Sequence, residues 1–289
     1  MEEQERQKGI DQAEPRLLYH YTDQKGLLGI IENKCLWATH SQFLNDLSEY
    51  QIAFDALQKK IRTERNDNWA NLLSSFLLAR QIKGIFVSSF SHERKADSLT
   101  MWRGYSAPLG GYSIGFDRLV LNLIANEIRT SEEKRWAELG KCFYTDPENS
   151  SLAESLEKQV ESDWNDPTGT GTLRPNIMEY VKLAALAKHI AFEEEDEWRI
   201  VVFDEEGAKS GRTRFHQGKS TIVPYLEVSW KDKDLPNPVR RVFIGPTPNM
   251  DEAAKAVEML LERNGISIKR NDCPDGVDVV PSKIPYRNW

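Results

Sequence analysis

Hydrophobic residues along the chain switch between the spacing of strands and the spacing of helices. Runs of apolar, aromatic and β-branched residues at 17–22, 34–39 and 85–91 predict short strands. Apolar residues three and four positions apart predict a helix that begins after Asp23, a candidate N-cap, and a second helix over 47–61. Strands and helices therefore mix from the start of the chain.

The remaining chain continues this mixture without a regular alternation of strand and helix. Further helices are predicted near 68–82, 97–105, 117–129 and 251–264 and over most of 150–192, and further strands at 112–116, 141–145, 198–203, 220–230 and 239–245. This order argues against a doubly wound sheet and predicts an α+β fold. We expect a loose tail over 1–15 and a single domain over 16–289, with a helical insertion around 146–192. The aromatic segment after Pro281 is expected to dock on the body of the protein.

Composition and charge narrow the class of protein. The chain has 289 residues, 39% of them hydrophobic, which is enough for a large buried core. Its formal net charge is -7 and its basic residues form no long block, so strong non-specific binding of nucleic acid is not indicated. Apolar stretches are shorter than the roughly 20 residues of a membrane-spanning helix, and the charged start predicts no secretion signal. Cys35, Cys142 and Cys273 lie far apart, which favours reduced thiols in a cytoplasmic protein and no metal site.

Two local sequence patterns are weak evidence for a function. Gly111-Tyr-Ser-Ile-Gly115 has the spacing of a nucleophile elbow, in which a strand leads to the serine and a helix follows at once. Ser113 instead stands within the alternating pattern of a predicted strand, which argues against a serine hydrolase. A second pattern, formed by His40, Asn45, Asp46 and Glu49, could be read as a set of metal ligands. We prefer a capping role for Asp46 and Glu49, because an acid three residues before a glutamate is typical of the start of a helix.

In the first of three polar segments, His20 and Thr22 interrupt an apolar strand. Alternation of side chains puts these two residues on one face of the strand, with Tyr19 and Tyr21 on the other. Two hydrogen-bonding side chains on one face could hold a ribose or an amide. The alternative is a histidine at a strand edge whose hydrogen bonds are satisfied within the protein.

The second and third segments combine polar groups with aromatic rings and with the start of a strand. Ser88-Ser-Phe-Ser91, followed by Met101-Trp-Arg-Gly-Tyr105, could form a slot for a flat ring, or a buried aromatic cluster with capping serines. The acidic run 193–197 is typical of a solvated surface, but an acid at the start of a strand could project into a cleft and stabilise a developing cation. Arg199 would share the strand face of Glu197 and could hold it by a charge-assisted pair.

These segments together resemble known protein families. The opening, Leu17-Leu-Tyr-His-Tyr-Thr22 followed by Gly26-Leu-Leu-Gly-Ile-Ile31 and Leu36-Trp-Ala-Thr39, resembles that of ADP-ribosyltransferases. Nearly the full length is similar to an uncharacterised bacterial family, through Leu18-Tyr-His-Tyr-Thr22, Phe43-Leu-Asn-Asp46 with Glu49, Ser89-Phe-Ser91 with Met101-Trp-Arg-Gly-Tyr105, Glu195 with Glu197-Trp-Arg199, Ile244-Gly-Pro246 and Ile284-Pro-Tyr-Arg287. The resemblance implies an ADP-ribosyltransferase-like split β-sheet with flanking helices.

The resemblance also implies NAD as substrate and a His–Tyr–Glu arrangement in the cleft of the sheet. His20 would hydrogen-bond the ribose next to the nicotinamide, with support from Thr22. Tyr105 would stack on the nicotinamide ring, and Trp102, on the same predicted helix, is the alternative for this role.

A carboxylate completes the implied arrangement. Glu197, or Glu195 in its place, would bind the ribose 2′-hydroxyl and stabilise the oxocarbenium-like transition state. Glu197→Gln should then abolish turnover and leave the fold intact. Further residues expected at the NAD site are Tyr21, Asn45, Ser89, Ser91 and Arg103. Arg103 would contact the pyrophosphate, with a surface salt bridge as its alternative.

The function implied is cleavage of the nicotinamide bond of NAD and transfer of ADP-ribose to a protein or nucleic-acid acceptor. Such enzymes act in bacteria as toxins or in phage defence, and a partner protein could restrain the activity. The alternatives are NAD hydrolysis, a non-catalytic module that binds a nucleotide or a partner, and the serine hydrolase. Convergence of His20, Tyr105 and Glu197 on one cleft would favour the enzyme.

Overall fold

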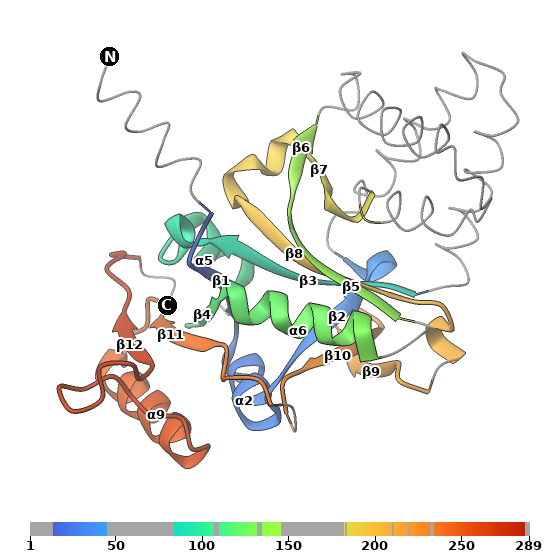
Figure 1. The fold of residues 1–289 in the computed structure, drawn as a ribbon. Coiled ribbons are helices and arrows are strands. Elements are labelled where there is room, and N and C mark those ends of the chain that lie inside the picture. Colours follow the sequence, from blue (N-terminus) through green and yellow to red (C-terminus); the bar gives the residue numbers. More distant parts are fainter. Residues whose placement is uncertain are drawn as a thin grey trace, which may run out of the picture. The chain divides into compact units, whose positions relative to one another are not determined.

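The computed structural model describes residues 14–44, 84–106, 110–131, 135–145, 182, 184–209, 211–218, 220–231 and 234–286 (Figure 1). Helices and strands are mixed among them, so the α+β prediction is confirmed. The chain divides into two compact units, which are described separately. Unit 1 consists of Met1–Asn33, Phe90–Leu121 and Lys233–Trp289, and unit 2 of Lys34–Ser89 and Asn122–Asp232.

The strands of unit 1 form a sheet in the order β12, β11, β4, β1 and the end of β3. Their bounds are Leu17–Thr22 for β1, Gly84–His92 for β3, Tyr112–Asp117 for β4, Val239–Ile244 for β11 and Asp278–Pro281 for β12. Neighbouring strands run antiparallel, except that β11 and β12 are parallel. The sequence pattern predicts all of these strands except β12, which is short and lies at the edge of the sheet.

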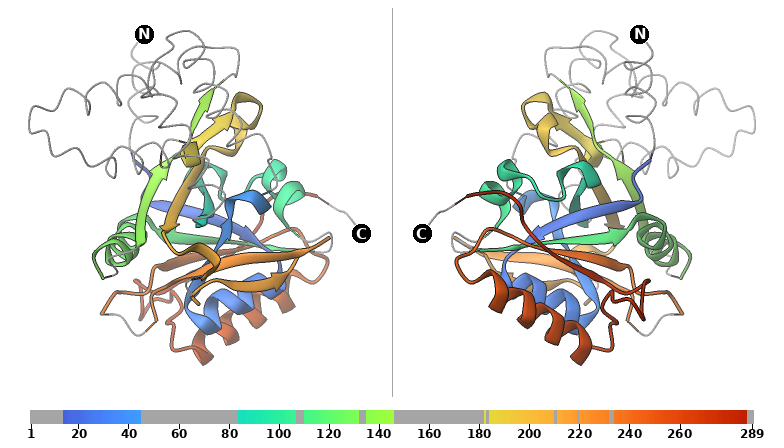
Figure 2. Two further views of the ribbon diagram at one scale, coloured as in Figure 1. Left: turned by 90° about the vertical axis from the view of Figure 1, so that its right-hand side faces the viewer. Right: turned by 90° about the vertical axis from the view of Figure 1, so that its left-hand side faces the viewer.

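Helices cover both faces of this sheet. Figure 2 shows α2 (Gln24–Asn33) and α9 (Met250–Arg263) side by side on one face, and α5 (Leu99–Tyr105) lies on the other. The Asp23 carboxylate accepts a hydrogen bond from the backbone N–H of Gly26 at 2.7 Å, so the predicted N-cap of α2 is confirmed. Both predicted helices and the short helix α5 therefore form where the apolar spacing indicates.

Tyr21 and Trp102 lie at the centre of the packing between β1 and α5. Their ring centroids are 4.7 Å apart and the rings meet edge to face at 73°. Met101 is buried beside them, and Phe243 and Ile284 pack against the same cluster. The edge-to-face arrangement is one that aromatic pairs prefer, so this contact stabilises the position of α5 on the sheet.

Asp97 joins the segment that follows β12 to the start of α5. Its carboxylate accepts hydrogen bonds from the indole N–H of Trp102 at 2.7 Å, the hydroxyl of Ser282 at 2.5 Å and the backbone N–H of Lys283 at 2.8 Å. The described part of the segment after Pro281, residues 282–286, is therefore docked on the body of the protein, as predicted.

The strands of unit 2 pair in the order β9, β10, β2, β3, β8 and β5. The bounds not yet given are Arg214–Gln217 for β9, Ile222–Ser229 for β10, Cys35–His40 for β2, Glu197–Asp204 for β8 and Arg135–Lys141 for β5. β8 is buried along its whole length and lies between β3 and β5. A separate parallel pair is formed by β6 (Phe143–Thr145) and β7 (Ala187–His189).

The other described elements are one helix and four short 3-10 turns. They are α6 (Arg118–Ser131), η1 (Ser41–Phe43), η2 (Glu93–Lys95), η3 (Ile190–Glu195) and η4 (Gly207–Lys209).

The structure corrects the sequence prediction in unit 2. Residues 187–189 form a strand, so the helical insertion expected around 146–192 is wrong there. The run of alanines and leucines favours a helix, and residues 184–186 are helical, but pairing with the distant strand β6 ends the helix before Ala187. Strands β5 and β9 are further elements that the hydrophobic pattern does not reveal. The helices expected over 47–61 and 68–82 and most of the expected insertion lie outside the described residues.

Replacing Asp97 with alanine is expected to lower the free energy of unfolding by about 1–3 kcal/mol, because the indole N–H of Trp102 loses its acceptor. Asp97→Asn keeps one acceptor oxygen and should lower the free energy of unfolding by a smaller amount. Urea unfolding followed by tryptophan fluorescence measures the difference. Limited proteolysis should also cut the segment after Pro281 faster in Asp97→Ala, and equal cleavage rates would contradict the proposed role of Asp97.

Candidate functional site

β1 presents His20 and Thr22 on the face opposite Tyr19 and Tyr21, as the alternation predicts. The two tyrosines are buried, whereas His20 and Thr22 are half-buried. The His20 ring lies 5.9 Å from the ring of Phe90. Tyr21, which the resemblance places at the NAD site, is instead part of the core beneath α5. β1 therefore keeps two polar side chains partly accessible on one face only.

The end of α5 meets the end of β1. A β-carbon at Gly111 would lie 2.3 Å from Cβ of Ser106 and 3.0 Å from the carbonyl oxygen of Thr22, so the close approach requires glycine. The hydroxyl of Thr22 also occupies the space that a β-carbon at Gly26 would need, only 1.8 Å away. Tyr105, next to Ser106 in the chain, therefore stands at the same end of the unit 1 sheet as Thr22.

The two aromatic residues that compete for the stacking role differ in exposure. Trp102 is 2% exposed, and it packs on Tyr21, on the face of β1 that points away from His20. Tyr105 is 40% exposed. The buried indole has no face open to a ligand, so Tyr105 is the candidate that remains for the predicted stacking role.

The remaining residues of the expected NAD site differ in their burial and in their contacts. Ser91 is buried, and its hydroxyl lies 3.9 Å from a methionine sulfur, which is a packing contact. Ser89 is half-buried in the part of β3 that belongs to unit 2. The exposed guanidinium of Arg103 lies 5.0 Å from the ring centroid of Tyr286, a cation–π contact. Asn45 lies outside the described residues.

Glu197 stands at the first position of β8 and is 4% exposed. Its carboxylate accepts two hydrogen bonds from Arg199, at 2.8 and 3.0 Å, and one from the ammonium of Lys188 at 2.6 Å. Lys188 also donates to Glu195 at 2.5 Å, and Arg199 donates to the carbonyl of Ala185 at 2.7 Å. The predicted pair between Glu197 and Arg199 is confirmed. We call Lys188, Glu195, Glu197 and Arg199 the Glu197 cluster, which has no net charge.

The path of the chain between β7 and β8 builds this cluster. After Lys188 in β7, η3 turns the chain, and Asp196 takes a left-handed conformation with φ of 43°. Aspartate tolerates this region better than most residues. At the start of β8, the backbone N–H of Glu197 donates to the hydroxyl of Tyr144 at 2.7 Å, and its carbonyl accepts from the N–H of Cys142 at 2.9 Å. The segment around β6 thus fixes the backbone of Glu197.

Neighbouring cations keep Glu197 ionised. Burial alone would raise the pKa of its carboxyl, but Arg199 and Lys188 outweigh burial and hold the pKa at about 2. Burial would lower the pKa of Lys188, yet Glu197 and Glu195 raise it above its ordinary value. A carboxyl with so low a pKa is a poor proton acceptor near neutral pH. While it is paired with Arg199 and Lys188, Glu197 therefore supplies a negative charge rather than a proton acceptor.

The geometry of β4 argues against the serine hydrolase. Ser113 is fully buried at the second position of this strand, and α6 begins only at Arg118, so the serine does not stand at a strand-to-helix turn. His40, one of the residues open to interpretation as a metal ligand, accepts a hydrogen bond from the backbone N–H of Gln42 and caps η1. Within the described ranges, no three His, Cys, Asp or Glu side chains are grouped to hold a metal ion.

A membrane-spanning helix is likewise not found in the part of the chain that the structure describes, since none of its helices is both long and apolar enough.

Each unit contributes part of the predicted site. His20 and Tyr105 belong to unit 1, and Glu197 and Glu195 belong to unit 2. Convergence of the three implied catalytic residues on one cleft therefore stays a prediction. Within unit 2 the structure adds Lys188, which the sequence does not single out. Lys188 is a single lysine within a run that favours a helix, so nothing in the sequence marks it as a partner of Glu197. Its contact with Glu197 depends on the pairing of β6 with β7.

Comparison with known proteins adds one family similarity. A family model described as protein of unknown function (DUF2971) matches residues 101–200. This range includes Met101-Trp-Arg-Gly-Tyr105 in α5 and Glu197-Trp-Arg199 in β8. No curated protein matches the chain, and no solved structure matches it. The chain is thus similar to this family over part of its length, and its resemblance to ADP-ribosyltransferases stays a prediction.

Glu197→Gln is expected to lower the free energy of unfolding by about 3–5 kcal/mol, because it leaves Arg199 buried without an ionised partner and removes one of the two carboxylates that pair with Lys188. The expectation that this variant leaves the fold intact is therefore revised. Glu195→Gln is the matched control, since Lys188 would keep Glu197 as its partner. Urea unfolding of both variants measures the loss in the free energy of unfolding. Equal losses would contradict the central role of Glu197 in the cluster.

Acid should remove the stability that Glu197 contributes. Its folded pKa of about 2 lies below the ordinary value of 4.5, so the folded state binds the proton more weakly than the unfolded state. The resulting contribution of about 3 kcal/mol is present above about pH 4.5 and is lost as the pH falls toward about 2. Thermal unfolding across this range should show a shallower pH dependence in Glu197→Gln than in the wild-type protein. Parallel profiles would rule out Glu197 as a source of the acid sensitivity.

Proposed function

We propose that this chain is an NAD-dependent ADP-ribosyltransferase-like enzyme that cleaves the nicotinamide glycosidic bond and transfers ADP-ribose to a macromolecule. The observation that carries the proposal is the half-buried pair His20 and Thr22 on one face of β1, with the exposed ring of Tyr105 at the end where Thr22 stands. Hydrogen-bonding side chains and an exposed aromatic ring at one end of the sheet are the kinds of group that bind a ribose carrying a flat base. The acceptor is a protein or a nucleic acid.

The proposed roles in unit 1 follow from exposure. His20 binds the ribose next to the nicotinamide, and Thr22 supports it. Tyr105 stacks on the nicotinamide ring, because Trp102 is buried in the core. The resemblance further suggests a bacterial toxin or phage-defence effector that acts in the cytoplasm under the control of a partner protein.

Glu197 acts in this proposal through its charge. Departure of nicotinamide develops positive charge on the ribose, and a carboxylate that stays ionised stabilises that charge. Lys188 and Arg199 neutralise the same carboxylate, so one of them has to release it when NAD binds. Lys188 is the residue that can move, because Glu195 offers it a second partner at 2.5 Å. Glu195 would then hold Lys188 aside, while Glu197 takes the catalytic role.

A second candidate is a non-catalytic module that binds a nucleotide or a partner protein. The Glu197 cluster favours it, because a carboxylate that is 4% exposed and paired at both oxygens is also what a purely structural ion pair requires. NAD hydrolysis, with water as the acceptor, is the catalytic variant of the first proposal.

Turnover of labelled NAD tests the proposal. The purified chain should release nicotinamide and, in the presence of bacterial extract or nucleic acid, should attach labelled ADP-ribose to a macromolecule. Tyr105→Ala should slow nicotinamide release by about fivefold, since a stacking contact is worth on the order of 1 kcal/mol. Tyr105→Phe keeps the ring and should retain most of the activity, whereas His20→Ala should lose it.

Controls separate the candidates. Leu119→Ala alters a large side chain that is 63% exposed on a helix and should leave turnover unchanged. Free ADP-ribose without labelled macromolecule would indicate hydrolysis. Binding of NAD by calorimetry without nicotinamide release would support the binding module. A wild-type protein that neither binds nor cleaves NAD would refute both the transferase and its hydrolytic variant.

A further inference from the structure

Unit 2 carries an exposed aromatic surface that the proposed function does not use. Trp37 of β2, Tyr225 of β10 and His216 of β9 have ring centroids 4.4 to 5.5 Å apart. The Trp37 ring is inclined by only 32° to Tyr225 and 34° to His216, which is closer to offset stacking than to an edge-to-face contact. We call these three residues the Trp37 platform.

The strand register puts the platform on a single face of the sheet. Directly opposed residues in antiparallel strands point to the same side, and Trp37 opposes Glu227 while Tyr225 opposes Arg214. Residues two apart on one strand share a face, which adds His216 to the same side as Arg214. Aromatic and charged side chains from three neighbouring strands therefore occupy one face.

Exposure shows which ring faces outward. Tyr225 is 7% exposed, whereas Trp37 is 38% exposed and lies against it. The indole thus packs against a tyrosine and a histidine, and more than a third of its residue surface stays exposed to solvent. A large aromatic ring held in place and left open is a common form of ligand-binding surface.

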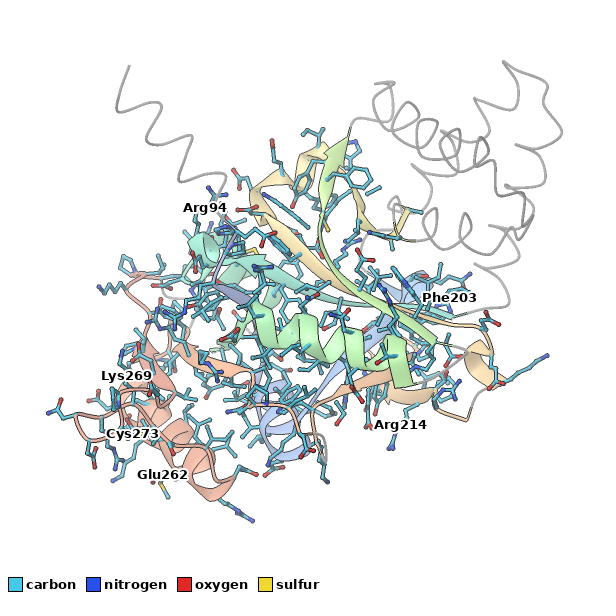
Figure 3. All side chains as sticks on the ribbon, in the orientation of Figure 1. Arg94, Phe203, Arg214, Glu262, Lys269 and Cys273 are labelled. Atoms are coloured by element: carbon cyan, nitrogen blue, oxygen red, sulfur yellow. The ribbon has the colours of Figure 1, made fainter. Side chains whose placement is uncertain are left out.

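The charged neighbours define what the platform can recognise. Arg214 and Glu227 lie 3.4 Å apart, with side chains that are 62% and 33% exposed. Figure 3 shows Arg214 extending outward from β9. The pair offers hydrogen-bond donors and an acceptor side by side, and the edges of nucleobases carry donors and acceptors in the same way. Its balanced charge provides no attraction for a run of phosphates.

We propose that the Trp37 platform binds an unpaired nucleobase, which stacks on the indole and places its edge against Arg214 and Glu227. A base in a duplex has both faces covered by its neighbours and cannot stack on a protein ring. The ligand is therefore a free nucleotide or an unpaired base in a single strand. Stacking of one base on an aromatic side chain changes affinity by roughly 5- to 150-fold. This inference does not depend on NAD cleavage.

Fluorescence anisotropy of labelled eight-nucleotide RNA and DNA strands, with the full chain, tests the inference. Trp37→Ala should weaken binding on the order of tenfold or more. Trp37→Phe should retain most of it. Phe215→Ala is the matched control, because Phe215 is adjacent to His216, points to the opposite face and is 58% exposed. The salt dependence should be shallow, since stacking rather than phosphate contact supplies the affinity.

Competition identifies the source of the base. Equal competition by a mononucleotide indicates a free nucleotide, and stronger binding of the oligomer indicates a single strand. Competition by an oligosaccharide but not by nucleotides overturns the inference, as does unchanged affinity in Trp37→Ala. If Trp37→Ala does not fold, photocrosslinking of a strand that contains 4-thiouridine to the wild-type protein tests the inference instead. Crosslinks in the peptides of Trp37, His216 or Tyr225 support the platform, and crosslinks only elsewhere, or none, refute it.

Discussion

A carboxylate that is buried in a protein has to be neutralised, and this constraint governs the structure around β8. An ionised group taken out of water costs several kcal/mol unless it is paired and hydrogen-bonded. Glu197 meets this requirement through Arg199 on its own strand and Lys188 on β7, while Tyr144 receives its backbone N–H. The small parallel pair of β6 and β7 and the left-handed turn at Asp196 bring these groups together. The same neutrality that stabilises the fold also limits the chemistry open to Glu197.

Unit 1 uses a carboxylate in a different way. Asp97 is half-buried and is satisfied by neutral donors rather than by cations. One of these donors, Ser282, lies 185 residues further along the chain. The orientation of α5, and with it the positions of Tyr105 and Arg103, depends on that distant segment. A residue far from the His20 face of β1 can therefore influence the position of the ring that we propose for stacking.

The sequence reveals those features that depend on local spacing. The faces of β1, the N-cap of α2 and the pairing of Glu197 with Arg199 follow from positions two or three residues apart. Features that depend on contacts between distant segments are not visible in the pattern. Lys188 reaches Glu197 only because β7 pairs with β6, and the packing alone reveals that Trp102 is buried whereas Tyr105 is exposed. Helix propensity correctly indicates the helical residues 184–186 but gives no sign that a strand begins at Ala187.

The order of the strands in unit 1 has a consequence for synthesis. β4 pairs with β1 on one side and with β11 on the other, and β11 begins at Val239, long after β4 ends at Asp117. At ordinary rates of translation, on the order of ten seconds separate the appearance of these two strands. During that interval a nascent chain has the apolar strand Tyr112–Asp117 with one unpaired edge, and such edges promote aggregation. A ribosome that stalls within unit 2 would leave the cell with that exposed edge, and chaperone binding at β4 would protect it until β11 arrives.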